Sequence, residues 1–209
     1  MIGFYNYTVY ATYAGFISAV CGLYLALTEE HPTFGIICLL VSGLCDMFDG
    51  KIARTRERTK AEQQFGIQID SLSDLVCFGV LPAVIGYVTG MQRWFYVPIL
   101  ALYMLCALIR LAYFNVTEEE RQTTETGTRR FYEGLPVTSS ALIFPLIYLL
   151  YFFVEPKWFT IIYAAALLIV AVAFISPFKL RKPGMKMLLV FLACGLIELA
   201  ILLVLRYVL

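Results

Sequence analysis

Long apolar runs separated by mostly short polar connections dominate the hydropathy pattern of this chain. A helix needs about 20 apolar residues to cross the hydrocarbon core of a membrane. Seven runs qualify, so the pattern predicts an all-α integral membrane protein, a polytopic helical bundle. The runs are approximately Tyr7–Leu27, Thr33–Arg54, Ile67–Gly90, Trp94–Val116, Pro136–Val154, Trp158–Ser176 and Lys186–Val208.

The connections predict a simple domain organisation. Only Arg54–Gly66 and Thr117–Leu135 are long, and both are polar and basic. No connection leaves room for a separate soluble domain, so we expect residues 1–209 to form one transmembrane domain.

Composition supports the membrane assignment. Hydrophobic residues make up 61% of the 209 residues, whereas a soluble domain is nearer half apolar. The net charge of +1 gives no reason to expect nucleic-acid binding. All six cysteines lie in or beside apolar runs and none forms a C-x-x-C pair, so we expect buried thiols. The N-terminus lacks the basic region of a secretory signal, so we expect the first helix to be retained.

The distribution of positive charge predicts an orientation. If the second, fourth and sixth runs end in the cytoplasm, thirteen of the sixteen Lys and Arg residues lie on that side. The other side holds only Arg93, Lys157 and Arg206. Because cytoplasmic connections are enriched in Lys and Arg, we expect this orientation in the cell membrane.

Four aspartates lie at the cytoplasmic edges of the second and third runs. Asp46 and Asp49 are three residues apart, and Asp70 and Asp74 are four residues apart. Each pair therefore lies on one face of a helix. If the two faces meet, four carboxylates converge. Such a cluster favours hard divalent cations with oxygen ligands, and these in turn suit a phosphate-bearing substrate.

Small residues accompany both pairs of aspartates. Gly50 and Ala53 continue the helix face that carries Asp46 and Asp49. Gly66 lies one turn before Asp70 on the face that carries the second pair. A structural ion network between the aspartates and basic residues such as Lys51 and Arg54 is the alternative. Glycine inside a helix costs up to about 1 kcal/mol relative to alanine, so aligned glycines are harder to explain in a structural network.

A second alternative is a cation transporter that uses intramembrane carboxylates. It would place acids near the middle of the membrane on several helices. Here the four aspartates lie towards one face on two adjacent helices, and Glu198 is the only acid near mid-membrane.

These residues resemble the signature of the CDP-alcohol phosphotransferase family, D-x-x-D-G-x-x-A-R, a spacer, then G-x-x-x-D-x-x-x-D. Every named position is filled, from Asp46 to Asp74. The Arg54–Gly66 spacer of eleven residues is longer than is usual in the family. The extra residues fall in the polar loop, so the two helical rows of aspartates are unaffected.

The flanking sequence looks most like bacterial and archaeal phosphatidylserine synthases. The matching stretches are Asp70–Ala83, Ile109–Asn115, Gly134–Pro136 and the SPFKLRKP stretch after the sixth run. The resemblance covers about residues 6–183 and implies a six-helix core. The run at about residues 186–208 is then an extra C-terminal transmembrane helix.

The resemblance implies a reaction in which the hydroxyl of L-serine attacks CDP-diacylglycerol, giving phosphatidylserine and CMP. It implies that Asp46, Asp49 and Asp70 hold two divalent cations, Mg²⁺ or Mn²⁺. Asp74 would lie near the metals and take the proton of the acceptor; its alternative is a fourth ligand only. The resemblance further implies a nucleotide site at Gly50, Ala53, Arg54 and Gly66, and a homodimer in the membrane.

Other polar residues are candidates for binding the acceptor or a phosphate. Arg110 lies inside an apolar run, where a guanidinium needs an anion unless it snorkels to the interface. Arg129 and Arg130 can equally be positive-inside residues that touch anionic lipids. Asn115 either orients a substrate or caps a helix end.

The acceptor and the lipid tails stay open at this point. Glycerol 3-phosphate or an inositol phosphate would call for a denser basic pocket than Arg110 alone provides. An archaeal-type lipid donor is equally compatible, because grooves that bind lipid tails follow no readable sequence code.

Overall fold

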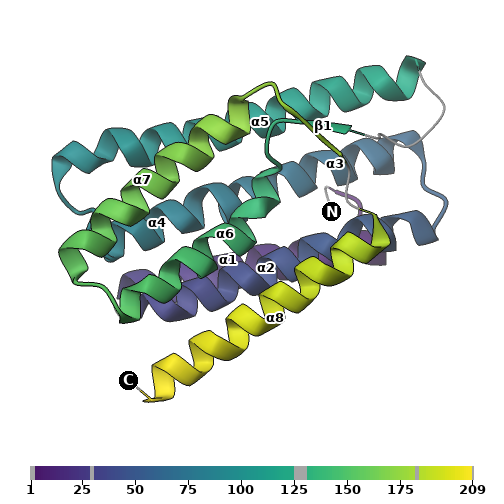
Figure 1. Cartoon of the computed structure of the whole chain (residues 1–209). Coiled ribbons are helices and arrows are strands. Elements are labelled where there is room, and N and C mark those ends of the chain that lie inside the picture. Colours follow the sequence, from purple (N-terminus) through teal and green to yellow (C-terminus); the bar gives the residue numbers. More distant parts are fainter. Residues whose placement is uncertain (1–2, 29–30, 125–130, 182–183, 209) are drawn as a thin grey trace.

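The apolar runs form α-helices in a computed structural model of the chain (Figure 1), which describes residues 3–28, 31–124, 131–181 and 184–208. Two strands of three residues each accompany the helices. The helices are α1 (Tyr10–Thr28), α2 (Pro32–Ile52), α3 (Lys60–Asp74), α4 (Leu81–Val88), α5 (Val97–Thr124), α6 (Ser140–Tyr148), α7 (Pro156–Ile175) and α8 (Met185–Val208); the strands are β1 (Phe131–Glu133) and β2 (Lys179–Arg181).

Six helices of the described residues are long and apolar enough to cross a membrane. One of them, Lys60–Val88, consists of α3, a π-helical segment at Leu75–Val80, and α4. The fifth predicted segment is a shorter apolar helix, Val137–Phe152, which has Pro145 inside α6. The prediction of an all-α membrane bundle is confirmed, while seven full-length crossings were expected and the fifth falls short.

Close packing of α1 against α2 sets one side of the bundle. A Cβ atom at Gly15 would lie 3.2 Å from Cys45 Cβ, and one at Gly22 would lie 2.7 Å from Cys38 Cβ. These two glycines therefore let α1 approach the backbone of α2. The approach matters because it brings the start of α1 beside the aspartates of α2.

A cluster of buried aromatic side chains joins α5, α6 and α7. Tyr103 contacts Phe144 and Phe174, and Phe144 contacts Tyr163, with ring centroids 5.3 to 5.6 Å apart. The buried tyrosine hydroxyls have partners: Tyr103 donates to the carbonyl of Phe78 at 2.6 Å, and Tyr163 donates to that of Pro82 at 3.0 Å. Both bonds tie the aromatic cluster to the long helix Lys60–Val88.

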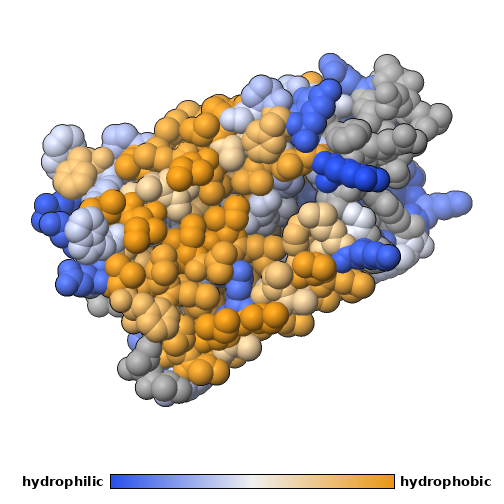
Figure 2. Space-filling model, in the orientation of Figure 1, coloured by the Kyte–Doolittle hydropathy of each residue, from blue (hydrophilic) through white to orange (hydrophobic). Residues whose placement is uncertain are grey.

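The surface matches a protein that spans a membrane. Figure 2 shows an apolar band across the bundle with hydrophilic residues gathered at its two ends. Large apolar side chains such as Ile169 (69% exposed) lie open on α7. A soluble monomer rarely exposes such a continuous apolar surface. The chain is therefore an integral membrane protein. All six cysteines are free thiols, but only Cys77 and Cys106 are buried, so the expectation of buried thiols is wrong for the other four.

The two long connections contain more structure than the hydropathy pattern predicted. The helix expected from Ile67 begins at Lys60, and the helix expected to end at Val116 continues to Thr124. Strands β1 and β2 pair antiparallel, with Tyr132 opposite Leu180. The connection before α6 is thereby joined to the connection before α8.

Helix α8 packs along α2 and α6 on one side of the bundle (Figure 1). Its end is fixed by the guanidinium of Arg206, which lies 4.0 Å from the ring centroid of Phe34 on α2. Glu198 faces inward and is only 7% exposed, and its buried Oε2 atom has no hydrogen-bond partner in the part of the chain that the structure describes. Burial without a partner is costly for a carboxyl group.

Candidate metal and nucleotide site

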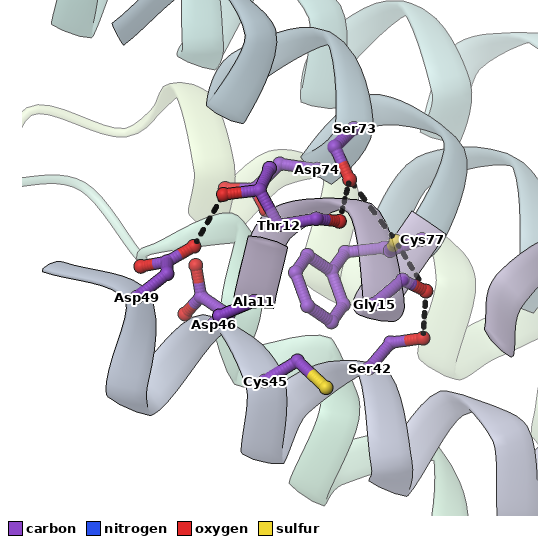
Figure 3. Close-up of a pocket in the computed structure, with 11 residues that line it drawn as sticks. Ala11, Thr12, Gly15, Ser42, Cys45, Asp46, Asp49, Ser73, Asp74 and Cys77 are labelled. Carbon is purple, nitrogen blue, oxygen red and sulfur yellow. Dashed lines mark hydrogen bonds between the residues drawn. The ribbon is translucent and has the colours of Figure 1, made fainter. Parts of the chain in front are cut away.

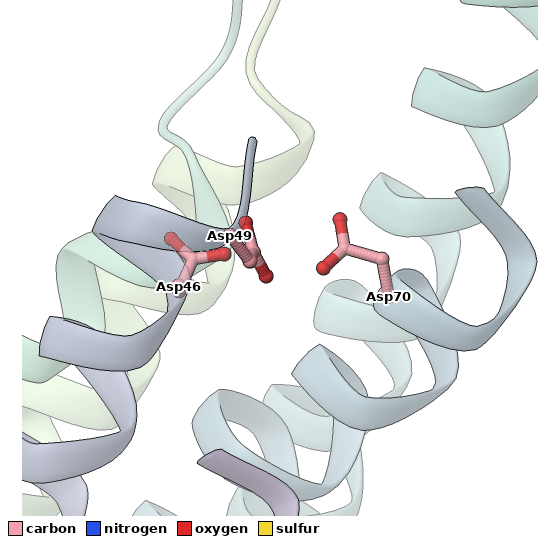
Figure 4. A group of neighbouring side chains, drawn as sticks. All are labelled: Asp46, Asp49 and Asp70. Carbon is pink, nitrogen blue, oxygen red and sulfur yellow. The ribbon is translucent and has the colours of Figure 1, made fainter. Parts of the chain in front are cut away.

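Three of the four aspartates meet between α2 and α3. One carboxylate oxygen from each of Asp46, Asp49 and Asp70 lies within 4.8 Å of the other two. Figure 4 shows the two α2 side chains directed towards Asp70 across the gap between the helices. The helical spacing seen in the sequence therefore produces the convergence that it predicted for these three residues.

The environment of these carboxylates is polar but short of donors. Asp49 is 8% exposed and accepts a hydrogen bond from the hydroxyl of Thr12 on α1 at 3.3 Å. The Oδ1 atom of Asp70 is buried and has no hydrogen-bond partner among the described residues. Since buried carboxylate oxygens normally have hydrogen-bond partners, this oxygen is available to coordinate a ligand.

Asp74 lies on the deeper side of the cluster. It lines a cavity of about 10 Å³ together with Asp46, Asp49, Thr12 and Ser73 (Figure 3). That volume is close to what one water molecule needs. Asp74 is outside the group of three whose oxygens lie within 4.8 Å, so it is next to the cluster without completing it.

A π-helical segment directly follows Asp74 and sets its direction. In this segment, Leu75–Val80, the backbone is wound more widely than in an α-helix, and Leu81 N donates to the carbonyl of Val76. An extra residue in one turn rotates the side chains of the helix before that turn relative to those after it. Phe78, within this segment, is fully buried and lines the same small cavity as Asp74, while its backbone carbonyl accepts the hydrogen bond from Tyr103.

The two glycines of the predicted nucleotide site differ in the space beside them. Among the described atoms, a Cβ atom at Gly50 would meet none within 4 Å, and one at Gly66 would meet only Arg58 Nη1, at 3.0 Å. Packing within the chain therefore does not explain the glycine at position 50. Ala53 is half-buried in the turn that follows α2, and the side chain of Arg54 lies outside the described part of the structure.

The candidate acceptor residues lie on α5 or beyond it. Arg110 is only 6% exposed, so its guanidinium does not snorkel into the interface, and it lies 5.5 Å from the ring centroid of Phe114.

Asn115 accepts a hydrogen bond at 2.9 Å from Ser71, the residue next to Asp70. Because α5 continues to Thr124, the interpretation of Asn115 as a helix cap is wrong. Arg129 and Arg130 lie outside the described residues.

Sequence reasoning missed the residues that order the loop between α2 and α3. Thr59 and Glu62 form a capping box: Thr59 N donates to Glu62 Oε2 at 2.9 Å, and Glu62 N donates to Thr59 Oγ1 at 3.2 Å. The T-x-x-E pattern is a known helix-start signal and could have placed the start of α3 at Lys60. Asn6 adds a bond from its Nδ2 atom to Glu62 at 3.3 Å.

Comparison with known proteins shows which family the chain that carries this site resembles. A family model described as CDP-alcohol phosphatidyltransferase matches residues 7–175. The CDP-diacylglycerol–serine O-phosphatidyltransferase of Saccharomyces cerevisiae is 40% identical over 140 residues, which are 65% of this chain and 50% of that protein.

Two further relatives come from other domains of life. The archaetidylserine synthase of Methanothermobacter thermautotrophicus is 32% identical over 136 residues, 65% of this chain and 54% of that protein. The CDP-diacylglycerol–serine O-phosphatidyltransferase of Helicobacter pylori (strain 26695) is 34% identical over 136 residues, 58% of this chain and 51% of that protein. The chain spans about half the length of these curated relatives.

Proposed function

The chain belongs to the CDP-alcohol phosphatidyltransferase family, and we propose that it transfers the phosphatidyl group of CDP-diacylglycerol to the hydroxyl of L-serine. The serine oxygen forms a bond to the phosphorus that carries the lipid, and the bond from that phosphorus to CMP breaks. CMP leaves with the electron pair, and the serine proton passes to a base. The names of the relatives support serine as the acceptor.

The observation that carries this proposal is the meeting of three carboxylates from two helices. Their donor atoms are all oxygens, the ligands that Mg²⁺ and Mn²⁺ prefer. The buried Oδ1 atom of Asp70 has no partner within residues 3–28, 31–124, 131–181 and 184–208, and it suits a cation ligand as well. The residues present therefore suit two divalent cations, with Asp46, Asp49 and Asp70 as the chain's ligands.

When bound, such ions would neutralise the diphosphate and stabilise the charge that develops on its oxygens. The chain's own residues do the positioning. Thr12 holds one oxygen of Asp49 by its 3.3 Å hydrogen bond, which orients that carboxylate towards Asp70. Phosphoryl-type transfer depends chiefly on such positioning and on charge neutralisation.

Asp74 is the proposed base. Its carboxylate lines the small cavity beside Asp46 and Asp49, which supports this role if the acceptor hydroxyl binds at the metal cluster. A general base must lie within hydrogen-bond reach of that proton, directly or through one water. The cavity has the size of one water molecule, which suits the second arrangement. The alternative role of Asp74 is a fourth metal ligand.

The remaining assignments concern the two substrates. The open space at Gly50 suits a nucleotide that approaches the helix backbone closely, and Gly66, beside Arg58, is the second proposed contact to that nucleotide. Arg110, buried on α5, and Asn115, bonded to Ser71 beside Asp70, are the proposed contacts to the acceptor or to a lipid-linked phosphate. Arg54, Arg129 and Arg130 stay predictions.

A second donor deserves a test because one relative is named for a different lipid. The names of the yeast and Methanothermobacter proteins share serine and differ in the lipid part. CDP-archaeol is therefore the alternative donor for the same site, with the same carboxylates and the same acceptor.

The decisive experiment uses the purified full chain in detergent. CDP-diacylglycerol or CDP-archaeol is supplied with labelled serine, glycerol 3-phosphate or an inositol phosphate, in Mg²⁺ or Mn²⁺ and then in excess EDTA. We expect CMP and a labelled lipid to form with serine, and both to stop forming in EDTA. Product formation only with another acceptor would refute serine, and CMP release that survives EDTA would refute the metal assignment.

A further inference from the structure

Arg58 lies in the loop between α2 and α3, and the chain holds this loop from both sides. Gln63 donates from Nε2 to the carbonyl of Arg58 at 2.9 Å, and the neighbouring Thr59 forms the capping box with Glu62. Tyr7, at the start of the chain, lies with its hydroxyl 3.0 Å from that of Thr55. The backbone from which the Arg58 side chain extends is therefore well ordered by its neighbours.

The guanidinium of Arg58 lies across the small-residue face of α3. Its Nη1 atom is 3.0 Å from the position that a Cβ atom would take at Gly66. The side chain is half-buried, and within the described part of the chain its guanidinium forms no hydrogen bond or ion pair. By contrast, Arg56 is exposed and has Glu62 Oε1 at 3.9 Å from Nη2.

This position faces the proposed nucleotide site. Gly66 precedes Asp70 by four residues, which is about 6 Å along the helix axis. Cations at the carboxylates would meet one side of a diphosphate, and the guanidinium is a positive charge supplied by the chain one turn away. A guanidinium presents several N–H donors in a planar fork that matches the oxygens of a phosphate.

We propose that Arg58 binds the diphosphate of the nucleotide-activated lipid and so belongs to the substrate site. The inference rests on the proposed function, because it takes a nucleotide diphosphate as the ligand of the face formed by Gly66 and Asp70. Arg58 is a binding residue in this proposal and takes no part in proton transfer.

The test measures nucleotide binding to the full-length protein in Mg²⁺ by titration calorimetry. The probes are CDP and cytidine, and the variants are Arg58→Ala, Arg58→Lys and the matched control Arg56→Ala. We expect Arg58→Ala to weaken CDP binding by at least about tenfold, because a charge-assisted bond to a phosphate is lost. Arg58→Lys should recover part of the affinity, and Arg56→Ala should stay within about twofold of the parent protein because its side chain is exposed.

Cytidine and thermal stability separate the possible causes. Cytidine has no phosphate, so its affinity should be the same in Arg58→Ala as in the parent protein. The melting temperature should also be unchanged, because the Arg58 guanidinium forms no hydrogen bond or ion pair with the residues that the structure describes. Unchanged CDP binding in Arg58→Ala would overturn the inference, and so would an equal loss for CDP and cytidine, which would place Arg58 at the base.

The outcome can be told apart from a failure of the proposed function. CMP release from CDP-diacylglycerol and serine by the parent protein is measured in parallel. Without any CMP release the proposed function fails, whatever the variants do. If the parent protein releases CMP and Arg58→Ala binds CDP normally, only the role of Arg58 is refuted.

Discussion

Single residues at this site combine catalytic potential with a cost to stability. Three carboxylates whose oxygens lie within 4.8 Å repel one another when no cation is present. A buried Oδ1 of Asp70 without a partner adds to that cost. Functional sites often contain groups that lower the stability of the fold in this way because the chemistry needs them.

Asp70→Asn tests this conflict directly. Removing one charge should raise thermal stability in EDTA, because repulsion within the cluster falls. The variant should gain no further stability from Mg²⁺ or Mn²⁺, and CMP release should drop by at least about 100-fold. Melting curves with and without metal, together with the activity assay, measure both effects. Glu57→Gln, an exposed acid in the adjoining loop, is the control and should behave like the parent protein.

Two glycines of α2 make opposite predictions. A Cβ atom at Gly50 meets nothing within 4 Å, whereas one at Gly43 would collide with Ala141 Cβ on α6. Gly50→Ala should leave the free energy of unfolding unchanged or raise it by up to about 1 kcal/mol, while weakening CMP binding about tenfold. Gly43→Ala should lower the free energy of unfolding by about 1–3 kcal/mol. Normal CMP binding by Gly50→Ala would remove Gly50 from the nucleotide site.

At the scale of helices, the π-helical segment after Asp74 is the element that orients the site. Its widened turn leaves backbone carbonyls that need partners, and the hydroxyl of Tyr103 on α5 meets one of them at Phe78. Ser140 Oγ on α6 lies 2.9 Å from the same hydroxyl. Two other helices thus hold the segment in place, and with it the carboxylate row that precedes it.

Tyr103→Phe should therefore reduce both stability and activity. The change leaves the carbonyl of Phe78 without its donor and should cost about 1–3 kcal/mol of unfolding free energy. Tyr163→Phe is the matched control, because Tyr163 is equally buried and donates to Pro82, farther from Asp74. We expect similar destabilisation in both, but a several-fold higher metal requirement for CMP release only in Tyr103→Phe. An equal metal requirement in the two variants would contradict this positioning role.

Helix α8 carries a buried acid that the proposed reaction does not use. Glu198 is 7% exposed with Oε2 unpartnered, and the family match ends at residue 175, before α8. Glu198→Met should raise the free energy of unfolding by about 1–3 kcal/mol and leave CMP release unchanged. Glu198→Gln should raise the free energy of unfolding less, since the buried amide of glutamine stays without a hydrogen-bond partner. Loss of activity in Glu198→Met with the fold intact would show that α8 contributes to the reaction.

At the scale of the whole molecule, the charge asymmetry predicts that the aspartate site opens to the cytoplasm. Cysteines introduced at Glu57, beside the site, and Gln92, at the opposite end, test this with a maleimide that cannot cross membranes. In right-side-out vesicles we expect labelling of Gln92→Cys and none of Glu57→Cys, with the unmodified chain as control. The reverse pattern would invert the orientation. The homodimer and the location in the cell membrane stay predictions.

Whole-molecule packing also explains which sequence predictions were incomplete. The apolar runs marked every membrane helix because burying a polar backbone in lipid requires a helix and an apolar surface. They did not show that the fifth helix is short, nor that β1 pairs with β2, because both depend on contacts distant in sequence. The division into a core of residues 6–183 and an extra helix stays a prediction.

The chain's own sequence determined the membrane bundle, the two carboxylate rows and the family resemblance, because helical periodicity and local spacing are properties of neighbouring residues. Only the tertiary structure decided that Asp46, Asp49 and Asp70 meet while Asp74 lines a cavity beside them. It also decided that Asn115 bonds to Ser71 and that Arg58 lies over Gly66. These facts depend on how α1 packs against α2 and how α3 packs against α1 and α5. They also depend on a π-helical turn whose rotation no local pattern specifies.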